Sequence, residues 1–106
     1  MEVFRIEEFT RGWFIGNFEP SLFVTKNFEV GLLSHSKGEI WPKHYHKSAT
    51  EYNLLISGLM KIQGKTIKPG DIFILNPGEI ADPEFIDDCK IVVIKSPSVP
   101  GDKFEV

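Results

Sequence analysis

The sequence has a single cysteine, no long apolar run and no cluster of basic residues. Because Cys89 has no second cysteine to pair with, an internal disulfide is excluded, which fits a reducing compartment. The longest apolar stretches, such as residues 91–94, are far too short to span a bilayer. Lysines and arginines are scattered singly and the formal net charge is −3, so neither a membrane nor a nucleic acid is expected as a partner.

The start of the chain also lacks a recognisable targeting signal. Residues 1–5 have neither the basic beginning nor the apolar run of a signal peptide, so a cytoplasmic protein is expected. A length of 106 residues suits one domain, residues 1–106.

Short apolar runs separated by turn residues recur along the chain, a pattern typical of an all-β sandwich or barrel. No stretch of about a dozen residues keeps an apolar stripe of helical period without meeting a glycine or a proline. After Lys95 the chain is too rich in proline for a central strand, and we expect it to lie along the barrel surface. The expected strands cover residues 12–15, 21–25, 28–34, 43–46, 52–57, 59–62, 71–75 and 90–95.

The segment around His44 and His46 carries the clearest chemical signal. In an extended chain these two side chains share a face about 6.6 Å apart, and Pro42 argues against a helix. A turn over residues 47–50 would return Glu51 beside them. Two imidazoles and one carboxylate suit a divalent transition metal such as iron, manganese, nickel, zinc or copper. The spacing alone also fits a His-x-His pair in a surface loop with Glu51 elsewhere.

A longer pattern surrounds these residues. The run Gly38, His44, His46, Glu51 and Gly58 resembles the first sequence motif of the cupin superfamily at each defining position. Five residues separate Gly38 from His44, four separate His46 from Glu51, and six separate Glu51 from Gly58. Such strict spacing over so long a motif makes the resemblance specific.

The resemblance covers most of the chain, with a barrel core at about residues 28–95 and a C-terminal tail at 96–106. It implies a single all-β domain, a cupin-type jelly-roll β-barrel of two antiparallel sheets. In metal-binding cupins the histidines and the glutamate of this motif are metal ligands, and here they would be His44, His46 and Glu51. The resemblance also implies a homodimer.

The second cupin motif is incomplete in this sequence. Family members carry a fourth ligand, a histidine, three residues after the glycine of a Pro-x-Gly segment, whereas Ala81 stands three residues after Gly78 here. Asp82 follows, and only a local bulge would turn its side chain inward. Asp82 is therefore a candidate fourth ligand or pocket acid, and the alternative is a turn residue preceding Pro83.

Other polar residues give weaker signals. Asn53 shares the alternation of Glu51 and is expected to line the pocket, or else to be an amide satisfied by the backbone. Trp41 is expected to flank the mouth of the barrel or to cover its end. His35 is expected to be a surface residue or a satisfied core residue, and Cys89, beside two acids, a packing residue. No catalytic residue is identified.

Three functions are consistent with this sequence. The first is a metal-dependent cupin enzyme, such as an oxygenase or an isomerase, acting on a small polar molecule inside the barrel. The second is a metal-independent protein similar to sugar-nucleotide keto-isomerases. Residues 44–47 also resemble the corresponding segment of those enzymes. The third is a non-catalytic cupin that binds a small molecule. The motif alone does not separate these functions, because one fold supports many reactions.

Overall fold

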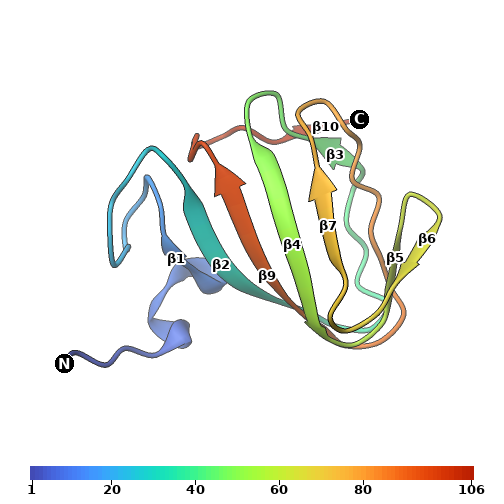
Figure 1. Ribbon diagram of the computed structural model, residues 1–106, viewed down its shortest axis with the longest axis horizontal. Helices are drawn as coiled ribbons and strands as arrows, with labels where there is room; N and C mark the ends of the chain where they lie inside the picture. The colour runs from blue at the N-terminus through green and yellow to red at the C-terminus, as the bar shows by residue number, and fades with distance from the viewer.

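The computed structural model describes residues 1–106, and short antiparallel strands dominate it (Figure 1). Two 3₁₀ helices come first, η1 (Ile6–Glu8) and η2 (Thr10–Gly12), and no helix in the chain is long and apolar enough to cross a membrane. The strands are β1 (Trp13–Ile15), β2 (Glu29–His35), β3 (His44–Tyr45), β4 (Thr50–Ser57), β5 (Met60–Ile62), β6 (Lys65–Ile67), β7 (Ile72–Leu75), β8 (Glu84–Phe85), β9 (Cys89–Ser96) and β10 (Phe104–Glu105).

One wall of the barrel is a five-stranded antiparallel sheet in the order β1-β2-β9-β4-β7. Its central strands β9 and β4 are rich in branched apolar residues, which favour a pleated backbone. Along β9 the buried residues alternate: Cys89, Ile91 and Val93 point inward and the residues between them do not. Lys95 continues the same inward face.

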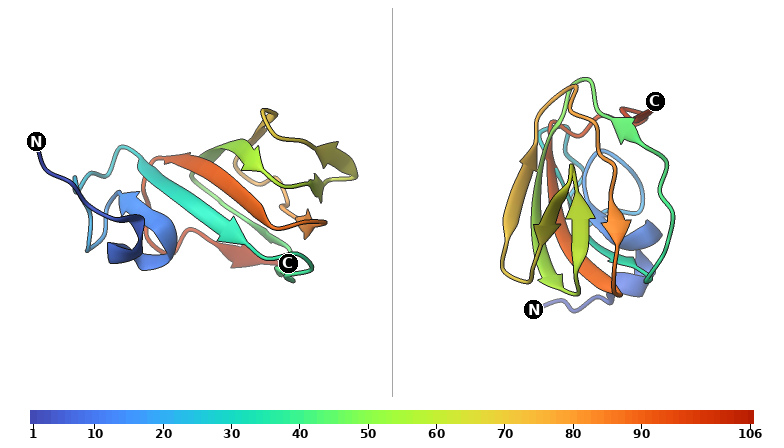
Figure 2. Two further views of the ribbon diagram at one scale, coloured as in Figure 1. Left: turned by 90° about the horizontal axis from the view of Figure 1, so that it is seen from below. Right: turned by 90° about the vertical axis from the view of Figure 1, so that its right-hand side faces the viewer.

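The facing wall is built from the short strands (Figure 2). One group has the order β6-β5-β8, and the other pairs β10 with β3. Two isolated bridges, Ile40 with Glu84 and His44 with Ala81, join the groups along this wall. The two walls confirm the expected all-β barrel of antiparallel sheets.

Between the walls lies a core of ten buried apolar side chains, with Leu55 completely buried and Met60 almost so. Cys89 is fully packed there, as expected for a packing residue, and burial raises the pKa of its thiol. The core fills the end of the barrel near the β4–β5 turn, where the Gly58 backbone closely approaches Asp88 and has a φ of +93°. The other end of the barrel is left to polar residues.

The outward face of the five-stranded sheet is apolar as well. Cross-strand pairs place Ile94 beside Tyr52 and Tyr52 beside Ile74, forming one apolar row. Val92, Leu54 and Ile72 form a second such row. Several of these side chains are well exposed, including Ile72 at 69%. We call the set the outer apolar face: Tyr52, Leu54, Ile56, Ile72, Ile74, Val92 and Ile94.

The expected strand at residues 21–25 is wrong, because this segment forms a turn. The Ser21 hydroxyl accepts hydrogen bonds from the backbone N–H groups of Gly16 and Phe23, and the backbone bonds of this segment to residues 14–16 are too irregular to form a strand. Strands β6, β8 and β10 were not expected from the sequence. Each has only two or three residues, too few to show an alternating pattern.

Candidate functional site

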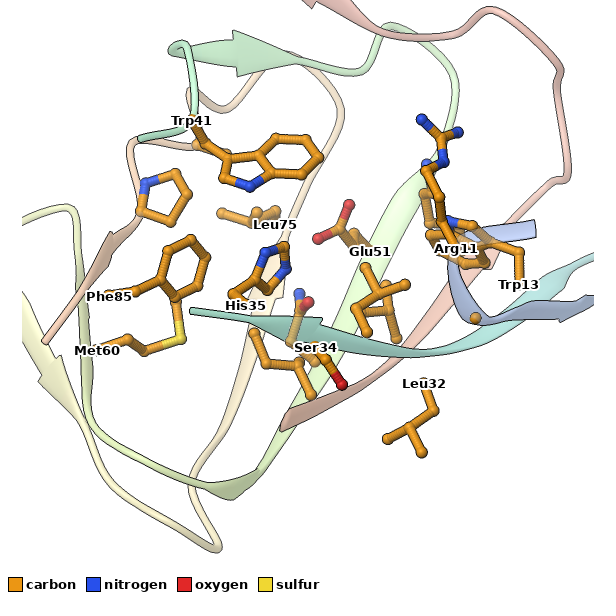
Figure 3. Close-up of a pocket in the computed structure, with 18 of the residues that line it drawn as sticks. Arg11, Trp13, Leu32, Ser34, His35, Trp41, Glu51, Met60, Leu75 and Phe85 are labelled. Carbon is orange, nitrogen blue, oxygen red and sulfur yellow. The ribbon is translucent and has the colours of Figure 1, made fainter. Parts of the chain in front are cut away.

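The barrel encloses a cavity of about 580 Å³. Of the 27 residues that line it, 14 are hydrophobic, so a few polar groups stand against an apolar background. Figure 3 shows the Glu51 carboxylate projecting inward from β4, with Trp41 and Phe85 on one side and Arg11 and Trp13 on the other. A cavity of this size and composition is suited to a small organic ligand.

His44 and His46 both face this cavity. They are only 8% and 5% exposed, and their ring centroids lie 5.4 Å apart. Tyr45, between them, stacks on Phe104 of β10 instead. The extended backbone at β3 therefore brings the two imidazoles to one face.

Each histidine is anchored through its Nδ1 atom. The Nδ1 of His44 lies 3.1 Å from the carbonyl oxygen of Pro42, and that of His46 contacts the carbonyl oxygen of Asp102. Because a carbonyl oxygen only accepts hydrogen bonds, Nδ1 must carry the proton in both rings. In the neutral form of each ring, Nε2 is then the nitrogen with a free lone pair.

The turn between His46 and Glu51 is held by a residue of the C-terminal tail. The buried Asp102 carboxylate accepts hydrogen bonds from the backbone N–H groups of Lys47, Ser48 and Ala49 at 2.9, 3.1 and 3.0 Å. Burial acts to raise the pKa of Asp102, but these hydrogen bonds outweigh it and the pKa is lowered. Asp102 thus fixes both the orientation of His46 and the path of the chain to Glu51.

His46 and Glu51 are in direct polar contact, with 3.0 Å between Nε2 and a carboxylate oxygen. Since Nδ1 of His46 carries a proton, a neutral ring would turn two lone pairs toward each other. A second proton or another cation must therefore lie between nitrogen and oxygen. The hydrogen bond to Glu51 raises the pKa of His46 despite its burial. Burial opposes ionisation of Glu51, but His46 and the charge of Lys95 lower its pKa overall.

The pKa of His44 is shifted in the opposite direction from that of His46. Burial is the main reason that the pKa of His44 is lowered, and the nearby Lys103 and His46 act in the same direction. Its Nε2 has no hydrogen-bond partner and is not among the buried unpaired atoms, so it is open to the cavity. His44 is therefore a neutral imidazole available for a ligand.

The donor chemistry fits a transition metal, because two Nε2 atoms of anchored imidazoles from the facing wall and one carboxylate from the five-stranded sheet line the same cavity. The ligating atoms are not gathered around a common point, however, and no three His, Cys, Asp or Glu side chains form a ready-made metal centre. The structure brings His46 into contact with Glu51 and sets the His44 ring beside them.

The place of a fourth ligand is taken by Ala81, which pairs with His44 in an antiparallel bridge and faces the cavity. Asp82, the next residue, does not line the cavity, and its carboxylate accepts a hydrogen bond from the backbone N–H of Gln63 at 2.7 Å. Asp82 lies between two isolated bridges that differ in register by one residue, and even so its side chain is directed to Gln63 and not to the histidines. The structure therefore leaves Asp82 outside this group.

Asn53 lies two residues beyond Glu51 on the same inward face of β4 and lines the cavity at 3% exposure. Its amide is close enough to help lower the pKa of Glu51, yet its Nδ2 makes no hydrogen bond of normal geometry. A buried N–H donor without a partner is uncommon and costly. Asn53 therefore offers an unused donor to the cavity.

A further polar group, around His35, lies at the other side of the cavity. His35 stacks on Phe85, and its Nδ1 lies 2.6 Å from Glu39, which also accepts a hydrogen bond from Trp41 Nε1. These bonds to His35 and Trp41 lower the pKa of Glu39. The available signal was alternation, because His35 shares the inward face of β2 with Gly31. His35 was expected to be a surface residue or a satisfied core residue; its place in the cavity was not predicted, because a single histidine at the end of a strand carries no motif.

The amino-acid sequence matches no family profile and no curated protein sequence. Solved structures, in contrast, resemble the chain closely in fold. A Klebsiella pneumoniae protein with a double-stranded β-helix domain has 22% identity and a TM-score of 0.73, with 98% of this chain and 90% of that chain covered.

Two further structures share the fold at lower coverage. The DMSP lyase DddQ from Ruegeria pomeroyi DSS-3 has 17% identity and a TM-score of 0.71, over 84% of this chain and 48% of that chain. A sugar phosphate isomerase of the cupin superfamily from Silicibacter pomeroyi has 17% identity and a TM-score of 0.60, over 76% of this chain and 57% of that chain. The chain thus spans about half the length of DddQ. These likenesses confirm the expected fold, that of a small cupin.

Proposed function

We propose that this protein is a small metal-binding cupin that holds a small polar molecule inside the barrel, with His44, His46 and Glu51 as ligands of a divalent transition metal. One observation supports this most directly: His46 and Glu51 meet at 3.0 Å on the cavity wall, beside a second anchored imidazole. Because two lone pairs would otherwise face each other at this contact, a cation is required there. A metal ion bound by both atoms would neutralise the repulsion as a proton does. Iron, manganese, nickel, zinc and copper all suit this donor set.

The reaction is proposed only as a class. Structures that share the fold include a lyase and a sugar phosphate isomerase, so the fold is compatible with several chemistries. We favour a metal-dependent enzyme of the oxygenase or isomerase class, and a non-catalytic binding protein is the alternative. A bound metal would polarise a carbonyl oxygen or lower the pKa of a water molecule.

Glu51, His44 and His46 would each contribute differently to the binding of such an ion. Glu51 supplies negative charge, and His44 is ready to bind because burial keeps its pKa below the ordinary 6.5. His46, whose pKa is raised above 6.5, must release a proton before its Nε2 can act as a ligand. The affinity for metal should therefore fall as the pH is lowered through the pKa of His46.

Elemental analysis of protein purified without a polyhistidine tag or chelators tests the proposal. We expect up to about one transition-metal ion per chain, lost in His44→Ala and in Glu51→Gln because each removes a ligand. Glu84→Gln is the matched control, since Glu84 is an exposed carboxylate outside the cavity. Circular dichroism establishes that the variants remain folded. Wild-type protein that stays free of metal after reconstitution with iron, manganese, nickel, zinc and copper would contradict the proposal.

A second candidate is acid–base catalysis without metal, as in the sugar-nucleotide keto-isomerases that residues 44–47 resemble. The observation that favours it is the His46–Glu51 hydrogen bond itself, which holds a proton at the cavity wall without a third ligand. In this alternative His46 would donate a proton to a substrate oxygen and recover it later. Binding of a sugar nucleotide by chelator-treated protein, abolished in His46→Gln, would support this candidate over the first.

We also propose that the protein forms a homodimer through the outer apolar face. Antiparallel sheets commonly show polar residues on the face that meets water, whereas this face has two apolar rows. No charge interrupts the rows, so a charged partner would find no complement there. A second copy brings an equally flat apolar sheet, and two sheets packed face to face bury both surfaces at once.

A further inference from the structure

Three cationic side chains line the cavity without a carboxylate partner of their own. Arg11 comes from η2, Lys95 from the inward face of β9, and Lys103 from the segment just before β10. None of the three takes part in a salt bridge. Cations from three separate segments thus meet at one place in the fold.

Aromatic contacts fix the position of two of these cations. The Lys103 ammonium lies 4.0 Å from the centre of the Trp41 ring, and the Lys95 ammonium lies 5.0 Å from that of Trp13. Both rings line the same cavity, and Figure 3 shows Arg11 on the side of Trp13. Burial and the positive charges of Lys95 and Arg11 lower the pKa of Lys103. The surroundings of Lys103 are therefore electropositive.

The acids nearby are largely engaged elsewhere. Glu51 is bonded to an imidazole, Glu39 accepts two side-chain hydrogen bonds, and Glu7 pairs with an arginine outside the cavity. Glu29 and Glu51 flank Lys95 on the neighbouring strands, but neither comes within salt-bridge distance of it. Arg11 and Lys103 remain without an opposite charge in contact.

A neutral donor adds to these cations. Asn53 Nδ2 is buried on the cavity wall near Glu51 but makes no hydrogen bond of normal geometry, so an acceptor in the cavity would complete its bonding. An incoming oxygen with negative charge would satisfy both the amide and the cations, whereas a cationic ligand would satisfy neither. The apolar majority of the lining is suited to a carbon skeleton.

From this geometry we propose that the cavity binds a small organic carboxylate, held at the opening by Arg11, Lys95 and Lys103 and within reach of the Asn53 amide. The inference rests on the proposed function only in taking the barrel interior as the ligand site, and it adds the chemical class of the ligand. A carboxylate oxygen accepts several N–H bonds at once, which matches the unused donors.

The test uses chelator-treated, metal-free protein, so that its result does not depend on the metal site. Malonate is titrated at low salt and followed by ¹H–¹⁵N NMR, including the side-chain amide signal of Asn53. We expect saturable binding, weakened about tenfold in Arg11→Gln and in Lys103→Gln, and retained in Lys103→Arg. Added salt should weaken it further, because the contacts are ionic.

Lys65→Gln serves as the matched control, since Lys65 is exposed on β6 and outside the cavity. Neutral malonamide should bind far more weakly than malonate. Equal binding of the two probes, or unchanged affinity in both cavity variants, would overturn the proposal. So would binding of inorganic phosphate in place of malonate, because the site would then select another anion. A failure of the metal proposal alone leaves these outcomes unaffected.

Discussion

The two faces of the five-stranded sheet have unusual and opposite polarities. On the inward face, a cross-strand row of Glu29, Lys95 and Glu51 brings charge into the barrel. On the outward face, the row next to it contains Ile94 and Tyr52, both well exposed. A sheet that covers only its own core would place these kinds of residues the other way round. The inversion agrees with the two proposals made above, a polar ligand inside the barrel and a second copy of the chain on the outer apolar face.

Burying the inward charges costs free energy of folding, which is offset only where they are paired or bind a ligand. Burial raises the pKa of Glu29 despite the neighbouring Lys95, which shows the free-energy cost of keeping that carboxylate ionised. Farther along the same strands, the inward face is fully apolar at Leu55 and Ile91. The inner face is therefore divided into a core that stabilises the fold and a polar end that is available for function.

The largest effect, a loss of stability, is expected where the inner face of the sheet is entirely apolar and buried. Leu55→Ala should lower the free energy of unfolding by about 3 kcal/mol, because it leaves a cavity around a completely buried position. Leu54→Ala, its neighbour on the outward face, should cost about 1 kcal/mol in the isolated chain. Urea denaturation at low protein concentration measures both. Equal losses would remove the distinction between the two faces.

The outer apolar face gives the next largest effect. Ile94→Lys places a charge in the middle of the proposed dimer interface and should weaken association by about thirtyfold or more. Light scattering coupled to size exclusion reports the mass of the species in solution. Ile40→Lys is the matched control, because Ile40 is 90% exposed and lies outside the sheet. A wild-type protein that remains monomeric at high concentration would contradict the proposed dimer.

The smallest effect concerns the contact that positions the inward residues. Asp102→Ala should weaken metal binding about tenfold and cost about 1 kcal/mol of stability, because the turn at residues 47–49 loses its acceptor. The pKa of Asp102 is lowered from 3.8, so its contribution is complete above pH 3.8 and disappears as the pH falls through the folded-state pKa. Thermal unfolding from neutral to acid pH should show the two proteins converging.

Asp71→Ala is the control for this prediction. Asp71 also accepts a backbone N–H bond in a turn, at 2.8 Å from Lys68, but lies outside the cavity. It should lower stability without changing the affinity for metal. If both variants lose metal equally, Asp102 affects metal binding only through the overall stability of the protein and not by positioning the site.

The alternation of residues along the sequence was enough to predict the long strands and the shared face of His44 and His46. The alternation of His44, Tyr45 and His46 sets both imidazoles on one face, because successive side chains of an extended chain point in opposite directions. The strands at β4 and β9 follow from the same rule, and so does the inward direction of Asn53. Strands β6, β8 and β10 were not predicted, because their two or three residues show no period and no motif marks them.

Alternation along each strand was enough to predict which side chains share a face, and the motif was enough to predict the type of fold. What those faces contact depends on the tertiary structure. Asp102 joins the site from a tail that was expected to lie on the surface, 56 residues from His46. Arg11 and Lys103 reach the same cavity from opposite ends of the chain. Such contacts depend on how strands pair across the barrel, and pairing is fixed by the packing of the whole core, which no local pattern records.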